Sequence, residues 1–103
     1  MVVWTDNAIS QITEFIDASK DNTEEIAKAY MGKLIDYVDT LNTMPCLGKK
    51  MDYKVFEYEL NQLIYREHRI IYHIKENDVV ILAIIHIKVD LDKASRKLKR
   101  NIS

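Results

Sequence analysis

A chain of 103 residues, 48% hydrophobic and 30% charged, has the size and composition of one globular domain, which excludes an intrinsically disordered protein. Its single cysteine, Cys46, excludes an internal disulfide and a paired-cysteine zinc site and fits a reducing compartment. No segment approaches the about 18 apolar residues of a membrane span, and the N-terminus lacks the pattern of a secretion signal. We therefore expect one domain over residues 1–103, located in the cytoplasm and without a membrane partner.

The net charge of −1 is unevenly distributed along the chain. Residues 1–48 hold three Lys and eight acidic residues, a net −5, whereas residues 49–103 hold twelve basic and eight acidic residues, a net +4. A basic second half attracts phosphate groups or an acidic partner. Lysines that keep strand edges from aggregating would give the same asymmetry, so both interpretations stay open.

The first half of the chain predicts a short strand followed by two helices. Residues 2–4 are apolar and β-prone, and a helix follows over about 6–19, where apolar residues recur at spacings of three and four. A second helix begins near Asn22, which opens a capping-box pattern, and keeps one apolar face over 26–41 until Pro45 stops it. The two helices are predicted to form an antiparallel hairpin.

The second half predicts an antiparallel meander of strands. The β-type segments, with a turn at Asn77-Asp78 before the last of them, are 55–60, 63–65, 69–74 and 79–89. Residues 79–85 are apolar on both faces, which predicts a central strand covered by the helix hairpin. The predicted fold class is α+β: a short N-terminal strand and an antiparallel helix hairpin pack on a mainly antiparallel, four-stranded sheet.

Two of these strands carry residues that point to a family. One reads Arg69-Ile70-Ile71-Tyr72-His73-Ile74 after Glu67-His68, and the other reads Val80-Ile81-Leu82-Ala83-Ile84-Ile85-His86. With Leu47-Gly48-Lys49 after the hairpin and the same element order, residues 2–91 resemble the RelE/ParE superfamily, the toxins of type II toxin-antitoxin systems. The segment Glu67-His68-Arg69 is most similar to the YoeB-like branch, and the ParE-like branch shares the fold.

The sequence departs from the family pattern at two places. Asn61-Gln62-Leu63-Ile64 lacks the Arg that members often carry before a Glu-Leu-Ile segment. The ending His86-Ile87-Lys88-Val89-Asp90 keeps the histidine, one cation and the acid of the common His-Gly-Arg-Arg-Asp. These losses weaken the case for a strong nuclease.

The resemblance implies a reaction. RelE-like toxins cut mRNA on the ribosome without a metal or other cofactor, by attack of a ribose 2′-hydroxyl on the adjacent phosphate. Such a reaction needs a base, an acid and fixed cations that stabilise the charge on the phosphate. We predict a ribosome-dependent mRNA endonuclease, because His86 and Arg69 are retained.

Three residues are the predicted catalytic groups. His86 titrates near neutral pH and is the acid/base candidate, or else it caps the strand end by bonding to backbone. Arg69 offers a planar fork that suits a phosphate, or else it pairs with Glu57, Glu59 or Glu67 across the sheet. Glu57 is the candidate general base.

Several cations are predicted to bind the RNA backbone without sequence choice. They are Lys49, Lys50, Lys54, Arg66 and Lys88. Taken without the family, Lys49, Lys50 and Lys54 in the connection to the sheet are more typical of a solvated loop. Tyr65 and Tyr72 are expected to pack rather than to stack on bases. The basic segment 93–100 suits ribosomal RNA, an acidic antitoxin segment or plain solvation.

Two other functions compete with the nuclease. The first is a ParE-like toxin that blocks DNA gyrase by binding, and the second is a degenerate member that only binds its antitoxin. The predicted partners are therefore the ribosome and mRNA, or DNA gyrase. All three functions imply a cognate antitoxin that adds to sheet edges, covers the basic groove and forms a toxin-antitoxin hetero-oligomer.

Overall fold

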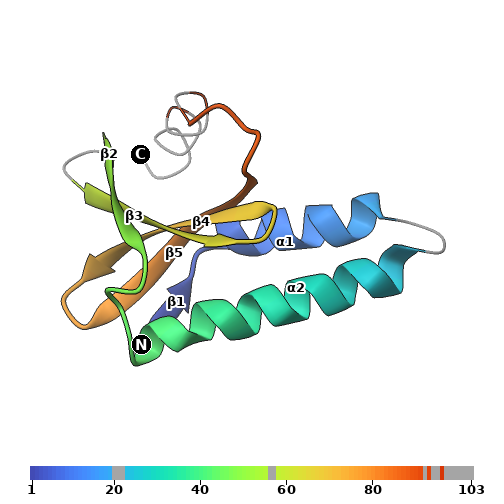
Figure 1. The fold of residues 1–103 in the computed structure, drawn as a ribbon, viewed down its shortest axis with the longest axis horizontal. Helices are drawn as coiled ribbons and strands as arrows, with labels where there is room; N and C mark the ends of the chain where they lie inside the picture. The colour runs from blue at the N-terminus through green and yellow to red at the C-terminus, as the bar shows by residue number, and fades with distance from the viewer. Residues whose placement is uncertain (20–22, 56–57, 92, 94–95, 97–103) are drawn as a thin grey trace.

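The computed structural model describes residues 1–19, 23–55, 58–91, 93 and 96 of the chain (Figure 1). In chain order the elements are β1 (Val2–Trp4), α1 (Asp6–Ala18), α2 (Glu24–Asp39), the 3-10 turn η2 (Thr40–Asn42), β2 (Lys49–Val55), β3 (Tyr58–Tyr65), β4 (His68–Lys75) and β5 (Asp78–His86). The predicted α+β class is confirmed, and so is the succession of a short strand, two helices and then antiparallel strands, although the structure has one strand more than predicted. Among the described residues, no helix is long and apolar enough to cross a membrane.

The sheet has five strands rather than the four predicted, in the order β1-β5-β4-β3-β2. Strands β2 to β5 form an antiparallel meander, while β1 joins β5 in parallel and makes the sheet mixed. Residues 49–54 were not predicted as a strand, and 55–60 and 63–65 are not two separate strands, since β3 runs without a break over 58–65. Val79 N donates to Met1 O at 2.8 Å, and Thr5 N donates to Ile81 O at 3.2 Å. The prediction was wrong here because a three-residue strand gives no sequence signal for its pairing partner.

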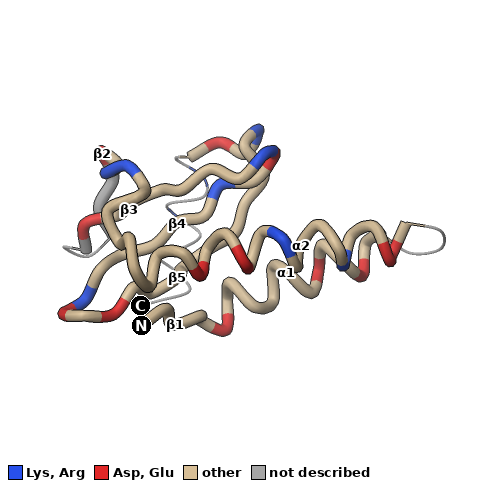
Figure 2. The backbone as a smooth tube through the Cα atoms, turned by 60° about the horizontal axis from the view of Figure 1, so that its bottom comes forward, with Lys and Arg blue, Asp and Glu red and all other residues tan. Residues whose placement is uncertain are grey.

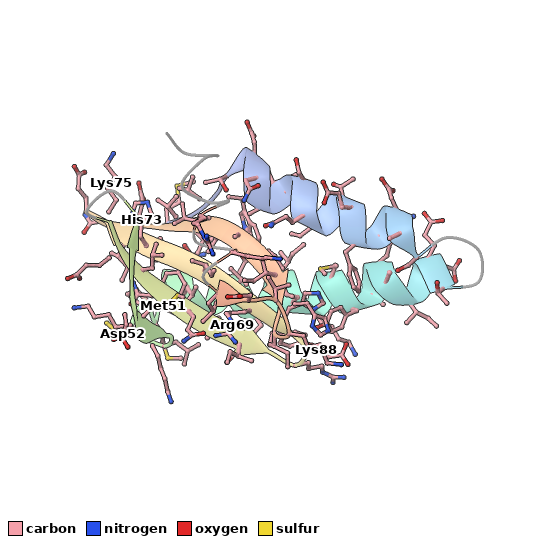
Figure 3. All side chains as sticks on the ribbon, turned by 90° about the horizontal axis from the view of Figure 1, so that it is seen from above. Met51, Asp52, Arg69, His73, Lys75 and Lys88 are labelled. Carbon is pink, nitrogen blue, oxygen red and sulfur yellow. The ribbon has the colours of Figure 1, made fainter. Side chains whose placement is uncertain are left out.

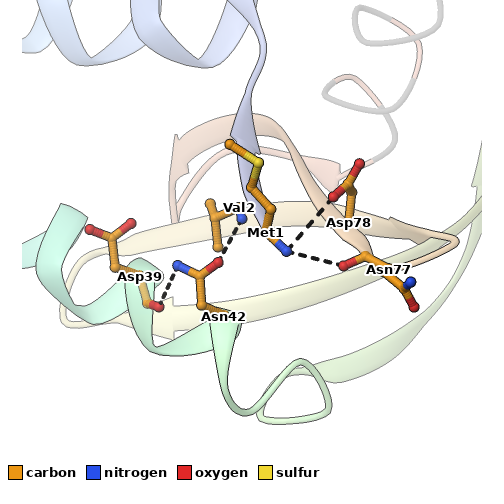
Figure 4. A network of polar contacts seen from close by, with 6 residues as sticks. All are labelled: Met1, Val2, Asp39, Asn42, Asn77 and Asp78. Carbon is orange, nitrogen blue, oxygen red and sulfur yellow. Dashed lines mark hydrogen bonds and ion pairs between the residues drawn. The ribbon is translucent and has the colours of Figure 1, made fainter.

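Polar contacts at the N-terminus also join β1 to the end of the helix hairpin (Figure 4). Val2 N donates to Asn42 Oδ1 at 2.8 Å, and Asn42 Nδ2 donates to Asp39 O at 3.2 Å. The Met1 amino group donates to Asn77 O at 3.1 Å and lies 3.7 Å from the carboxylate of Asp78. Together these contacts fix the short strand between α2 and the β4–β5 turn.

Both helices lie on one side of the sheet, which we call the helix face (Figure 1). Thr5 is the N-cap of α1, because its side chain accepts a hydrogen bond from Ala8 N at 3.3 Å, and the helix begins at Asp6. The main core lies between helices and sheet. Its buried members are Ala8, Met31, Leu34, Val38, Leu41, Leu63, Ile70, Tyr72, Val79, Ile81 and Ile84.

The opposite side of the sheet, the outer face, carries a smaller cluster of buried residues: Met51, Leu60, Ile71, Leu82 and Ala83. Leu91, beyond β5, packs against it. β5 therefore contributes buried side chains to both faces, as its continuous apolar run predicted.

A β-bulge at Leu82 divides β5 into two registers. Tyr72 pairs with Ile81, but the preceding residue Ile71 pairs with Ala83, so Leu82 is the extra residue. Two α1 side chains bond to this part of β5, where β1 has ended: Asn7 Nδ2 donates to Leu82 O at 2.9 Å, and Ile84 N donates to Gln11 Oε1 at 2.7 Å. Because side chains alternate along a strand, one inserted residue reverses the face of everything after it.

Some predicted boundaries were wrong. α2 ends at Asp39 and continues as a 3-10 turn, β2 begins at Lys49, and β5 ends at His86 rather than at residue 89. The β4–β5 turn consists of residues 76–77, because Asp78 already pairs in the sheet. Glu76 has a φ of 57° there, a left-handed conformation that gives no residue-type signal at a glutamate. The predicted capping residue Asn22 lies outside the described residues.

The connection from α2 to β2 is anchored on Tyr72. The Tyr72 side chain is fully buried, and its hydroxyl donates to Pro45 O at 3.1 Å and accepts from Gly48 N at 3.1 Å. A Cβ added to Gly48 would lie 2.3 Å from this hydroxyl and 2.6 Å from Gln62 O. The prediction that Tyr72 is a packing group is confirmed, and glycine is required at position 48 by this close approach.

Candidate functional site

His86 lies at the end of β5, directly opposite His68 at the start of β4. Its side chain is 37% exposed. Nδ1 accepts a hydrogen bond from Lys88 N at 3.1 Å, and Nε2 lies 4.0 Å from the carboxylate of Glu67. His86 therefore makes the strand-end backbone contact that the sequence allowed as its structural role, while its second ring nitrogen faces an acid.

His68, which the sequence analysis did not select, is the buried partner of His86. The two rings lie 5.6 Å apart in an edge-to-face arrangement, and His68 Nδ1 lies 2.7 Å from the Tyr30 hydroxyl. Burial lowers the pKa of His68, the neighbouring His86 lowers it further, and Glu67 acts in the opposite direction. Burial also raises the pKa of the Tyr30 hydroxyl. His68 alternates with Ile70 and Tyr72, and this pattern was the available sign that it faces the helices.

An open groove adjoins this cluster. It lies between the C-terminal end of α1, the N-terminal end of α2 and the β3–β4 turn. Its volume is about 210 Å³, and it is lined by Phe15, Ser19, Thr23, Ile26, Ala27, Tyr30 and Glu67. The Phe15 ring lies 5.1 Å from His68 at an interplanar angle of 90°. The groove is thus mainly apolar, with one carboxylate at its rim.

Arg69 is the next residue along β4, and its side chain is on the outer face (Figure 3). It pairs with Ile64 on β3 and with Ile85 on β5. Its Nη1 donates a short hydrogen bond to Gln62 Oε1. Its Nε is buried, and no partner for it exists among the described residues. The described acids Glu59 and Glu67 pair elsewhere, with Lys50 and near His86.

The two principal catalytic candidates, His86 and Arg69, are therefore on opposite faces of the sheet. His86 shares the helix face with His68, its cross-strand partner, whereas Arg69 is one residue further along β4 and faces outward. The bulge at Leu82 produces this arrangement. Without the extra residue, the register of the β4–β5 turn would continue and place His86 on the face of Arg69.

The predicted RNA-binding cations do not form one group. Lys49 pairs with Gln62 and so shares the outer face with Arg69. Lys50 is on the other face and forms an ion pair with Glu59 at 3.1 Å. Arg66, in the β3–β4 turn, lies 5.8 Å over the Tyr65 ring. Lys88 is exposed after β5.

Two predicted residues have no described side chain. Lys54 belongs to β2 and is opposite Glu59 in the backbone register, but its side chain lies outside the described part of the chain, and so does Glu57 entirely. Most of the basic segment 93–100 is also outside it. In the described part, the helices carry mainly acidic residues and the strands carry more of the basic ones (Figure 2).

A metal centre has no support in the described part of the chain, where no three His, Cys, Asp or Glu side chains are grouped to hold an ion. The chemistry that the described residues offer is of two kinds. On the helix face, the imidazoles of His68 and His86 lie beside the Tyr30 hydroxyl and the Glu67 carboxylate. On the outer face, the Arg69 guanidinium has one nitrogen bonded and one buried nitrogen without an acceptor among the described residues.

The antiparallel strands β3 to β5, the helix hairpin on one face and the histidine at the end of β5 agree with the predicted resemblance to the RelE/ParE toxins. The family model described as ParE toxin of type II toxin-antitoxin system, parDE, matches residues 2–91. The chain therefore belongs to the ParE toxin family, and the predicted membership of the superfamily is confirmed.

A solved structure supports the fold. It is described as the chromosomal ParDE TA system from P. aeruginosa, and it matches with a TM-score of 0.70 over 84% of this chain and 95% of that chain. At 18% sequence identity this likeness concerns the fold alone. No curated protein matches the chain.

Proposed function

We propose that this protein is a cytoplasmic toxin that acts by binding DNA gyrase, and that a cognate antitoxin neutralises it in a hetero-oligomeric complex. The observation that carries the proposal is the placement of His86 and Arg69 on opposite faces of the sheet. The ParE family model that matches residues 2–91 points in the same direction.

Cleavage of a phosphodiester requires the proton-transfer group and the stabilising cation to reach the same phosphate at hydrogen-bond distance. Arg69 is held on the outer face by Gln62, and His86 is held at the strand end by Lys88 N. A sheet separates the two side chains, so one phosphate would not contact both. Inhibition by binding needs no assembled acid–base pair, and this favours gyrase over mRNA as the target.

The test is induced expression of the toxin in bacteria, with growth, plasmid supercoiling and message integrity measured together. The wild-type protein is expected to arrest growth and to change plasmid supercoiling, without primer-extension stops inside translated codons. The variant His86→Ala is expected to arrest growth as the wild type does, provided that immunoblots show equal amounts of both.

The nuclease prediction gives the opposite pattern. Growth arrest accompanied by cleavage inside translated codons, with both effects lost in His86→Ala and in Arg69→Ala, would overturn the proposal. Arrest that antitoxin co-expression does not relieve would contradict the proposed partner.

A further inference from the structure

The turn that follows β5 is bonded to the strand end through His86. Val89 N donates to His86 O at 3.0 Å, which is a backbone contact. The second contact uses the side chain, because Lys88 N donates to His86 Nδ1 at 3.1 Å. Shortly after this turn, Leu91 packs against the cluster of buried residues on the outer face. The path of the chain from β5 to the outer face therefore begins at an imidazole.

The contact with Lys88 identifies the nitrogen that carries the proton when His86 is neutral. Nδ1 accepts a hydrogen bond and so holds a lone pair, which leaves the proton on Nε2. Nε2 lies 4.0 Å from the Glu67 carboxylate. When the ring gains a second proton, both nitrogens are donors, and Nδ1 can no longer accept from Lys88 N. Protonation therefore breaks this bond and strengthens the attraction to Glu67.

The titratable and charged groups around His86 come from three elements. His68 on β4 is its edge-to-face neighbour at 5.6 Å, and the Tyr30 hydroxyl on α2 lies 2.7 Å from His68 Nδ1. Arg66 and Glu67 form the β3–β4 turn, and the Glu67 side chain is 75% exposed. From α1, the ring that packs on His68 is an uncharged phenylalanine. Among these groups, a carboxylate is the one that attracts a positively charged His86.

We propose that His86 is a pH-sensitive switch for the turn of residues 87–89. With a neutral ring, Lys88 N is bound and the turn directs Leu91 onto the outer-face cluster. With a protonated ring, the bond to Lys88 is lost, the ring is held by Glu67, and the turn detaches from the strand end more often. The inference goes beyond the proposed function, since the switch operates in the toxin alone.

The tautomer of His86 is the first test. Long-range proton–nitrogen NMR of the imidazole rings in the full chain distinguishes the two nitrogens. The neutral form of His86 is expected to carry its proton on Nε2. A neutral form with the proton on Nδ1 would overturn the proposal, because that nitrogen could not accept from Lys88 N.

The second test is amide hydrogen exchange of the full chain at pH 7.5 and 5.5, corrected for the intrinsic effect of pH on the exchange rate. The protection of Lys88 N–H is expected to fall about three- to tenfold at the lower pH, the effect of losing one hydrogen bond. Val89 N–H belongs to the same turn and is expected to follow. If Lys88 loses protection while Val89 does not, the turn stays in place and the proposal fails.

An amide elsewhere on β5 separates the switch from general unfolding. Thr5 N donates to Ile81 O, where β1 joins β5, and is expected to keep its protection at both pH values. Equal losses at Thr5 and Lys88 would overturn the switch and would assign the effect to opening of the whole sheet.

Two variants of His86 complete the experiment. His86→Asn places an amide oxygen near the position of Nδ1, and this acceptor does not titrate, so Lys88 N–H is expected to be protected equally at both pH values. His86→Phe keeps a ring without an acceptor and is expected to show protection about three- to tenfold below wild type already at pH 7.5. Wild-type protection in His86→Phe, or a wild-type pH dependence in His86→Asn, would overturn the proposal.

Discussion

The two faces of the sheet differ most clearly at two consecutive residues, His68 and Arg69. His68 faces the helices and meets the Tyr30 hydroxyl at 2.7 Å, whereas Arg69 faces outward with a buried nitrogen that nothing described completes. On the helix face, polar groups find their partners within the chain. The comparison teaches that the described polar groups of the helix face are satisfied by contacts that also hold the fold, whereas Arg69 on the outer face leaves one buried donor without an acceptor among the described residues. Four predictions follow from this difference.

The largest effect is expected at Gly48, on the helix side of the comparison. Gly48→Ala would push a methyl group into the Tyr72 hydroxyl and Gln62 O, so we expect a loss of about 3 kcal/mol in the free energy of unfolding. Gly32→Ala is the control, since a Cβ there meets nothing within 4 Å, and it should stabilise α2 by about 0.5–1 kcal/mol. Urea unfolding measures the stability of both variants. Equal changes in stability for Gly48→Ala and Gly32→Ala would refute the close approach of position 48 to the Tyr72 hydroxyl.

Tyr72→Phe tests the same anchor more gently. The variant keeps the buried ring and removes the hydroxyl that joins Pro45 O and Gly48 N, so the expected loss is about 1–2 kcal/mol. Thermal unfolding measures it, with Tyr37→Phe, on a partly buried ring that packs on Tyr65, as the matched control. The account predicts the smaller loss for Tyr37→Phe, and the reverse order would count against the anchor.

The buried histidines predict a pH dependence. Burial lowers the pKa of His68 on the helix face and of His73 on the outer face, so the folded state binds fewer protons than the unfolded state below about pH 6.5. Stability is therefore expected to fall as the pH drops below that value, by at most about 1.4 kcal/mol per pH unit for each histidine. Urea unfolding at pH 7.5 and 5.5 should show a weaker pH dependence in His68→Gln than in wild type. An unchanged dependence would contradict the assignment.

The smallest effect on stability is expected on the outer face. Arg69→Met removes a buried donor that lacks an acceptor, so the free toxin should be as stable as wild type or up to about 1 kcal/mol more stable. Thermal melting of the free toxin measures this. A destabilisation of several kcal/mol would show that Arg69 is satisfied within the chain and would remove the contrast between the faces.

Much of the fold could be predicted from the sequence, because it rests on local periodicity. The apolar spacing of the two helices and the continuous apolar run of β5 predicted the hairpin, the meander and the central strand. The pairing of β1 could not be predicted, since three residues do not specify a register. The β4–β5 turn was predicted one residue too late, because its left-handed residue is Glu76, which gives no turn signal.

The candidate site was predicted less well than the fold. His86 and Arg69 were correctly placed on neighbouring strands, and their catalytic roles stay predictions. The face on which His86 lies follows from the alternation of side chains along β5, counted from the β4–β5 turn. A single bulge at Leu82 shifts this alternation by one residue and moves His86 to the face opposite Arg69. The side chains that bond to β5 near the bulge, Asn7 and Gln11, come from α1, far away in the sequence.

The most direct test of the central claim is a supercoiling assay with purified DNA gyrase, ATP, relaxed plasmid and the toxin. The account predicts that the toxin inhibits supercoiling, that His86→Ala inhibits equally well, and that added antitoxin restores the activity. Unchanged supercoiling at a large excess of toxin, together with His86-dependent cleavage of mRNA on ribosomes, would contradict it.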